Sequence, residues 1–115
     1  TGLVELLQAQ CAVWPHKQRP ADFRQPLTGK LPVLILSGEF DPVTPPRYGD
    51  MVARHLPNSR HIVVKGAGHN VLPVGCMPKL FAKFLETADA KALDAGCIES
   101  LTYAPMFTGF YGSEP

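Results

Sequence analysis

Residues 33–46 read VLILSGEFDPVTPP, an uninterrupted apolar run that leads into a proline-rich loop. The first four residues, Val33 to Leu36, do not alternate with polar residues. This pattern is typical of a strand in a parallel sheet, because helices on both faces keep such a strand away from water. We therefore predict a central strand over 33–36, followed by a loop from Gly38 to Val43.

A helix and a second strand are predicted after this loop. Thr44 can cap a helix whose first turn accepts Pro45 and Pro46, and Pro57 closes it. Apolar and aromatic residues recur within it at helical spacing, together with one histidine: Tyr48, Met51, Val52 and His55. The second strand covers 61–64 and ends at the loop Gly66-Ala67-Gly68-His69, in which the glycines allow a tight turn.

A further helix opens at Pro78, and we expect one apolar face of it to point inward. The residues of that face are Leu80, Phe81, Phe84 and Leu85. The order strand, helix, strand, helix predicts an α/β fold with parallel strands and helices on the sheet faces. Two parallel strands leave edges and faces that three helices cover only in part, so we expect the sheet to be incomplete in this chain.

The flanking segments divide the chain at about residue 29. Residues 2–14 form a predicted amphipathic helix, with Leu3, Leu6, Leu7, Cys11 and Trp14 at helical spacing, and a long loop follows to Gly29. We expect 1–29 to be a helix and loop, and 30–115 to be the α/β segment. The tail 96–115 has no periodicity and is expected to be an extended arm or to fray. The chain does not begin with Met, and its first residues look like a cut end.

Composition narrows the class of protein. With 115 residues, one compact unit is expected, and its 45% hydrophobic content should be buried. The net charge of +1 comes with scattered Lys and Arg, so we expect no nucleic-acid partner. The apolar run Leu31 to Leu36 is far shorter than the roughly 20 residues of a membrane-spanning helix, so we expect no membrane partner.

Two ionisable residues follow the two strands, and they carry the predicted chemistry. Asp41 lies in the loop after the first strand and His69 in the loop after the second. Because the carboxyl ends of neighbouring parallel strands meet at one edge of a sheet, the two side chains should lie close together. A carboxylate can then orient an imidazole that takes the proton of a nucleophilic alcohol. We predict Asp41 as the acid and His69 as the base of a catalytic triad.

Other polar residues fit structural roles better. Glu39 lies nearer to the strand than Asp41, and Asp50 falls inside a helix, where a solvated face is expected. His16, His55 and His61 fall in a loop, at a helix end and at a strand start, where histidine is usually structural. The aromatic residues Trp14, Phe81 and Phe84 lie on helix faces at core spacing.

The loops just described resemble those of α/β-hydrolases. Residues 34–46 look like the acid-loop motif of that superfamily, and Gly66 to His69 look like its histidine loop. The likeness extends to 11–15, to 56–60 and to the two cysteines that bracket the last predicted helix. Together these segments resemble the C-terminal region of tripeptidyl aminopeptidase-like and prolyl aminopeptidase-like enzymes. The resemblance implies a secreted or periplasmic serine exopeptidase that acts on peptides or esters, and it would make residues 1–29 the end of a cap region.

One element of that family is missing from the chain. No Gly-x-Ser-x-Gly motif occurs, and the serines lie in unsuitable contexts: Ser37, Ser59, Ser100 and Ser113. We expect the isolated chain to be inactive and its partner to be a hydrolase region that carries the nucleophile. The alternative is a noncatalytic binding or assembly module that pairs through its exposed sheet edge, possible also between copies of the chain. A metal-dependent hydrolase that uses Asp41 and His69 as ligands is a third possibility.

The three cysteines match no zinc-ligand or redox spacing, so we expect neither a metal nor a cofactor. Cys76 precedes the last predicted helix and Cys97 follows it. Two interpretations stay open: a disulfide formed in an oxidising compartment, or two buried free thiols. If Cys76 and Cys97 form a disulfide, Cys11 has no cysteine left to pair with in this chain.

Overall fold

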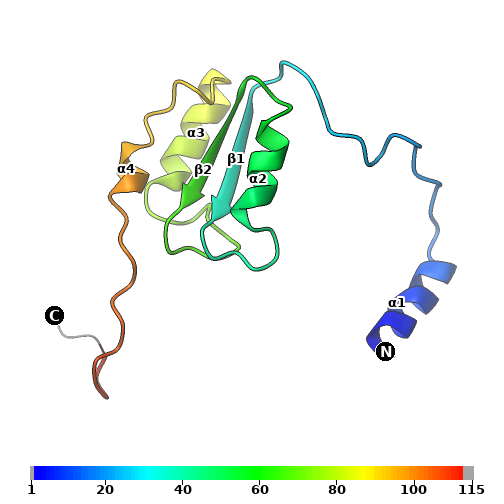
Figure 1. The fold of residues 1–115 in the computed structure, drawn as a ribbon, viewed down its shortest axis with the longest axis horizontal. Helices are drawn as coiled ribbons and strands as arrows, with labels where there is room; N and C mark the ends of the chain where they lie inside the picture. The colour runs from blue at the N-terminus through cyan, green and yellow to red at the C-terminus, as the bar shows by residue number, and fades with distance from the viewer. Residues whose placement is uncertain (1, 113–115) are drawn as a thin grey trace.

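The computed structural model describes residues 2–112 and has a strand–helix–strand–helix unit at its centre (Figure 1). Thr1 and residues 113–115, which belong to the predicted segments 1–29 and 30–115, lie outside the described residues, and so does Ser113. The elements are α1 Gly2–Val13, β1 Val33–Gly38, α2 Pro46–Ala53, β2 Ser59–Val64, α3 Met77–Thr87 and α4 Gly96–Glu99. The predicted order and the α/β class are confirmed.

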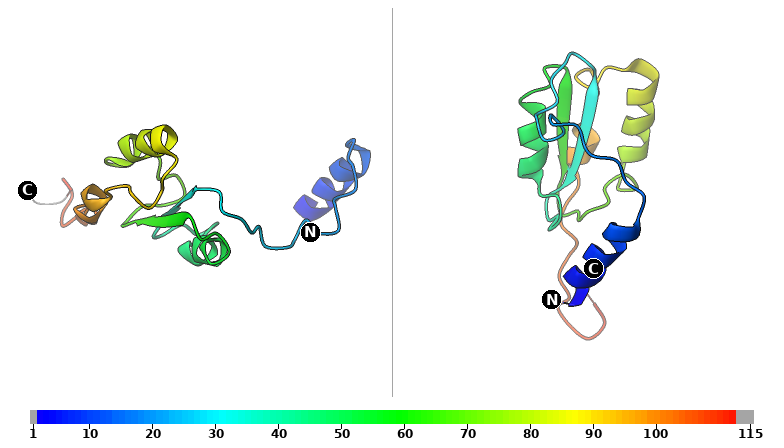
Figure 2. Two further views of the ribbon diagram at one scale, coloured as in Figure 1. Left: turned by 90° about the horizontal axis from the view of Figure 1, so that it is seen from above. Right: turned by 90° about the vertical axis from the view of Figure 1, so that its right-hand side faces the viewer.

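The two strands pair in parallel, in register from Val33 opposite Ser59 to Gly38 opposite Val64. Helices α2 and α3 lie on opposite faces of this two-stranded sheet (Figure 2). Because both strands end at the same edge, the loops that follow β1 and β2 leave the sheet side by side. This arrangement brings the two predicted site loops together.

The buried core lies on the α3 face of the sheet. Alternate side chains of the two strands point to this face, as the strand period of two requires. Its members are Ile62, Val64, Val71, Met77, Leu80, Ala95 and Ile98, with Leu34, Leu36, Ala67, Val74, Cys76 and Leu101 packed against them. Residues 33–36 of β1 are half-buried rather than covered on both faces, in keeping with an incomplete sheet.

Two residues of the predicted helices have other roles than expected. Pro45, not Thr44, is the N-cap of α2, and it makes no side-chain capping bond. The Thr44 hydroxyl donates to the Asp41 carboxylate instead, so it is not available to cap the helix. In α3, Leu85 is 66% exposed, because at 3.6 residues per turn it falls at the margin of the face formed by Met77, Leu80 and Phe84.

Helix α1 lies apart from the sheet, at the end of a long loop (Figures 1 and 2). None of its residues is buried, and Trp14 just beyond it is 74% exposed. The prediction that the apolar content is buried is therefore wrong for this segment, and so is the core placement of Trp14. The apolar stripe of α1 has no surface within residues 2–112 to pack on.

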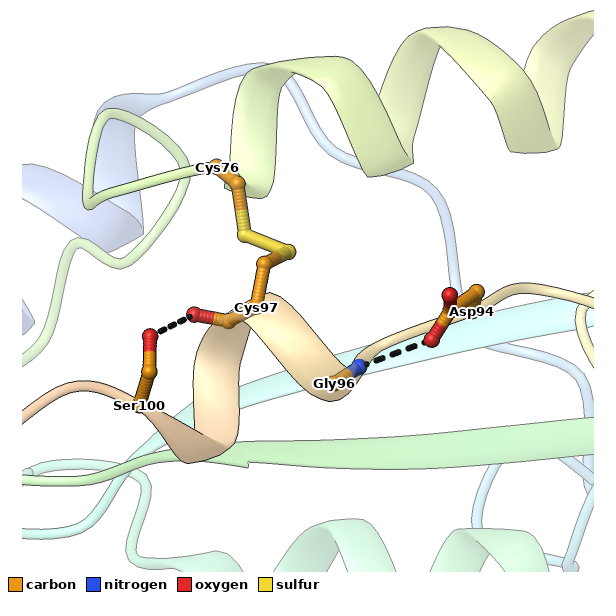
Figure 3. The surroundings of a disulfide bond; sticks show 5 residues. All are labelled: Cys76, Asp94, Gly96, Cys97 and Ser100. Carbon is orange, nitrogen blue, oxygen red and sulfur yellow. Dashed lines mark hydrogen bonds between the residues drawn. A yellow bond between two sulfur atoms is a disulfide. The ribbon is translucent and has the colours of Figure 1, made fainter.

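The segment after α3 contains a short helix, α4, that the sequence does not indicate. A disulfide joins Cys76, just before α3, to Cys97 in α4, with the two Cα atoms 6.4 Å apart (Figure 3). The carboxylate of Asp94 accepts from the Gly96 N–H, and the Ser100 hydroxyl donates to the Cys97 carbonyl. Of the two interpretations of these cysteines, the structure has the disulfide, and Cys11 is an exposed free thiol. Helix α4 has only four residues, which is too short for a helical pattern of apolar residues to be recognised in the sequence.

Candidate active site

Asp41 is fixed at the end of β1 by a tight turn. Its N–H donates to the Gly38 carbonyl at 3.2 Å. Its carboxylate accepts the N–H groups of Val43 and Thr44 through Oδ1, at 2.8 and 3.0 Å. The Thr44 hydroxyl donates to Oδ2 at 2.7 Å. An aspartate that binds the backbone of the following residues in this way stabilises a turn, and here it also sets the direction of Oδ2.

His69 meets this oxygen from the neighbouring loop. Its Nδ1 lies 2.9 Å from Asp41 Oδ2, so the predicted pair is brought together. The carboxylate side chain is 2% exposed, whereas the imidazole is 64% exposed. Since an ionised carboxylate can only accept, the Nδ1 atom carries the proton of this bond. Within the described residues Nε2 has no hydrogen-bond partner, which leaves it available to an incoming group.

The two loops touch through their backbones. A side chain on Gly38 would place its Cβ 1.9 Å from the Gly68 carbonyl oxygen, so only glycine fits at residue 38. The N–H of Phe40 donates to the Ala67 carbonyl at 2.9 Å, and Gly66 has a φ of +68°, which favours glycine. Gly66 and Gly68 are predicted to allow a tight turn, and the positive φ of Gly66 fits this prediction, but the close approach of the two loops occurs at Gly38.

The environment of Asp41 favours its ionised form. Burial alone would raise the pKa of the carboxyl group. The hydrogen bonds from the Thr44 hydroxyl, from the N–H groups of Thr44 and Val43 and from His69 act in the opposite direction and outweigh burial. The pKa of Asp41 is therefore held well below its usual value. A carboxylate that stays charged can stabilise an imidazolium beside it.

The rival acids have other partners. The Glu39 carboxylate accepts the Gly66 N–H at 2.8 Å and the Tyr103 hydroxyl at 3.0 Å. Asp50 is 61% exposed, but it does not simply face solvent, because its Oδ1 lies 2.9 Å from Nδ1 of His61. Neither acid contacts His69 in the structure.

His61 joins α2 to the sheet. Its Nε2 atom lies 2.9 Å from the Ser37 hydroxyl, which makes a second serine–histidine–aspartate chain with Asp50. Ser37 is only 7% exposed, so this hydroxyl is not placed to meet a substrate. A Cβ on Gly49 of α2 would lie 2.4 Å from the same imidazole nitrogen. Gly49 therefore makes room for a structural histidine.

The sequence does not predict the roles of two residues near the site, Thr44 and Tyr103. The sequence predicts Thr44 as a helix cap, whereas its hydroxyl donates to Asp41 and lies 3.4 Å from His69 Nδ1. Tyr103 lies far along the chain, and no local pattern links it to Glu39.

Among residues 2–112 no cluster of three or more potential metal-ligating side chains occurs. Over the same residues, no helix has the length and apolar character needed to cross a bilayer.

Comparisons with known proteins identify the family of the chain. The family model described as TAP-like protein, an α/β-hydrolase family, matches residues 3–97, which is most of the chain. The chain is also similar to pimeloyl-[acyl-carrier protein] methyl ester esterase of Neisseria meningitidis serogroup C / serotype 2a, with 46% identity over 39 residues. That stretch is 34% of this chain and only 15% of the esterase. No solved structure matches the chain.

Proposed function

This chain belongs to the TAP-like family of α/β-hydrolases, and from that premise we propose that it supplies the acid Asp41 and the base His69 of a Ser–Asp–His triad. The observation that carries the proposal is the 2.9 Å contact between Asp41 Oδ2 and His69 Nδ1. The serine would come from a hydrolase region outside these residues, because the chain contains no Gly-x-Ser-x-Gly motif.

The proposed chemistry is acyl transfer. The exposed Nε2 of His69 would take the proton of the serine hydroxyl while the serine oxygen attacks the substrate carbonyl. The charged Asp41 carboxylate would stabilise the imidazolium that forms. His69 would then give the proton to the leaving group, and water would release the acyl group by the same route.

For the substrate we propose a peptide with a free amino terminus, cut by an exopeptidase. The support is the resemblance of the acid and histidine loops to tripeptidyl and prolyl aminopeptidase-like enzymes. The esterase relative favours an ester instead, and it is the basis of a second candidate substrate class. The same triad would cleave either substrate, so the two candidates differ only in the residues around the triad that would bind the substrate.

The test uses this chain together with the region that carries the nucleophile, as one polypeptide or as a complex. Asp41→Asn should lower kcat by about 10⁴-fold, and His69→Gln by on the order of 10⁶-fold. The matched controls Asp22→Asn and His16→Gln change exposed residues of the loop before β1 and should leave kcat unchanged. Near-normal activity of either site variant would refute the triad.

The substrate class is tested separately with p-nitroanilides and p-nitrophenyl esters. An exopeptidase should cleave an aminoacyl p-nitroanilide and lose this activity when the amino group is acetylated. Cleavage of esters alone would refute the exopeptidase assignment and leave the triad intact. The isolated chain is expected to hydrolyse neither substrate faster than its His69→Ala variant.

A further inference from the structure

We call residues 100–112 the C-terminal arm. Its residue Tyr103 contacts the loop that carries Asp41. The Tyr103 hydroxyl donates to Glu39 Oε1 at 3.0 Å, and its ring stacks on Phe40 with the centroids 5.8 Å apart. The ammonium group of Lys65 lies 4.7 Å above the same ring. Tyr103 thus contacts the two residues just before Asp41 and the start of the histidine loop.

Glu39 connects three separate segments through one carboxylate. One oxygen accepts the Tyr103 hydroxyl, and the other accepts the N–H of Gly66 at 2.8 Å. Its backbone N–H donates to the Val64 carbonyl at 3.0 Å. The hydrogen bond to Glu39, then desolvation and the negative charge of Glu39, raise the pKa of Tyr103. The acid loop, the histidine loop and the arm therefore meet at this side chain.

We propose that Glu39 and Tyr103 are positioning residues, which hold the acid and histidine loops at the spacing that the Asp41–His69 pair requires. The catalytic part of this inference rests on the proposed function. Neither residue touches His69, so they act through Gly66 and through Phe40, whose N–H binds the Ala67 carbonyl. We name this junction of Glu39, Tyr103, Phe40 and Gly66 the latch.

The arm is anchored close to the latch. Cys97 is joined to Cys76 by the disulfide (Figure 3). The Leu101 N–H donates to the Ile98 carbonyl at 3.1 Å. A Cβ on Gly75 would lie 3.2 Å from a Leu101 methyl group, so the arm packs closely there. Tyr103 follows only two residues later, which limits how far its ring can move from Phe40.

The kinetic test uses the chain with its nucleophile-bearing region. Glu39→Leu should lower kcat about 10–100-fold, because small misplacements of catalytic groups are costly, with KM changed less than about threefold. Glu39→Gln should recover most of the loss, since its amide oxygen can still accept the Gly66 N–H and its amide NH2 can donate to the Tyr103 hydroxyl oxygen. The double variant Glu39→Leu/Tyr103→Phe should be no slower than Glu39→Leu, because both changes remove the same bond. The controls Glu99→Gln and Tyr111→Phe change exposed residues and should have no effect.

Two results with Glu39→Leu alone would overturn the latch. One is a normal kcat in Glu39→Leu. The other is a loss of kcat that only follows the fraction of folded protein, measured by circular dichroism on the same samples. Independent and additive effects of Glu39→Leu and Tyr103→Phe would also contradict a shared bond.

A second measurement does not depend on catalysis. The hydrogen-bonded proton on His69 Nδ1 gives a low-field proton resonance in nuclear magnetic resonance spectra, and it should broaden or vanish in Glu39→Leu and in Tyr103→Ala. It should persist in Glu99→Gln and Tyr111→Phe. If no variant hydrolyses any substrate but the resonance responds as expected, the proposed function fails and the latch stands. An unchanged resonance in Glu39→Leu refutes the latch whatever the activity.

Discussion

At the scale of single residues, the acid of the proposed triad is defined by its neighbours. Thr44 contributes both its N–H and its hydroxyl to the Asp41 carboxylate, and Val43 adds a second N–H. These donors are oriented by the turn itself, before any substrate or nucleophile is present. The oxygen that faces His69 is therefore aimed by local backbone geometry.

The depressed pKa of Asp41 predicts an acid-dependent loss of stability. A carboxyl group whose pKa is lower in the folded state stabilises the fold fully above its unfolded pKa of about 3.9. This contribution is lost as the pH falls below that value toward the folded pKa. We expect the free energy of unfolding, measured by urea denaturation, to fall between about pH 5 and pH 2.

The same titration of two variants isolates the residue responsible. In Asp41→Asn the acid-dependent part should be smaller, because the amide does not titrate. Asp22→Asn, which changes an exposed loop carboxylate, should retain the full dependence. An identical pH dependence in wild type and Asp41→Asn would contradict the depressed pKa.

The sequence predicts Asp41 and His69 because each follows a strand in a recognisable loop. It does not predict Tyr103, whose link to Glu39 spans 64 positions and depends on where the arm leaves α4. Nor does it predict the need for glycine at 38, which arises only when two backbones from different loops approach. Contacts of this kind are decided by tertiary packing, so local patterns do not reveal them.

At the scale of elements, strands β1 and β2 were predictable from their apolar runs and helices α2 and α3 from helical spacing, but the ends of these elements were not. Helix α2 ends at Ala53 rather than reaching Pro57. Its N-cap is Pro45 and not the predicted Thr44, because the Thr44 hydroxyl is bound to Asp41. The hydrogen bonds of Thr44 to Asp41 use a residue that helix propensity would assign to capping. Helix α4 was missed because the disulfide and the Asp94 carboxylate define it more than an apolar stripe does.

The disulfide should stabilise the packing of α4 against α3. Replacing both cysteines, in Cys76→Ser/Cys97→Ser, should lower the free energy of unfolding by about 2–4 kcal/mol, the usual range for a bridge that closes a loop. Urea denaturation without reductant would measure this change. Cys11→Ser removes an exposed free thiol and should leave the stability unchanged. Equal stabilities of wild type and the double variant would show that the bridge adds nothing to the packing.

At the scale of the whole molecule, the chain exposes much of its apolar surface. The stripe of α1 is uncovered, with Leu3 69% and Leu7 50% exposed, and the sheet has only two strands. Exposed apolar area of this kind marks an interaction surface. We propose that the missing hydrolase region covers it, since that region is the partner the proposed triad requires.

This proposal predicts a loss of affinity when the stripe is charged. Leu7→Lys should weaken binding to the nucleophile-bearing region by about 2 kcal/mol, which is roughly thirtyfold in Kd by titration calorimetry. Ala9→Lys adds the same charge about half a turn away on α1 and should change Kd little. Equal effects of the two substitutions would contradict an apolar contact through this stripe.

The contact of Gly38 with the Gly68 carbonyl also constrains how such enzymes can diversify. An acid loop taken from a relative must keep glycine at position 38, because a Cβ there would lie 1.9 Å from the Gly68 carbonyl oxygen of the histidine loop. The fit between the two loops is a property of the pair, although α2 and β2 separate them along the chain. Chimeras that transplant them together should therefore tolerate more sequence change than chimeras that split them.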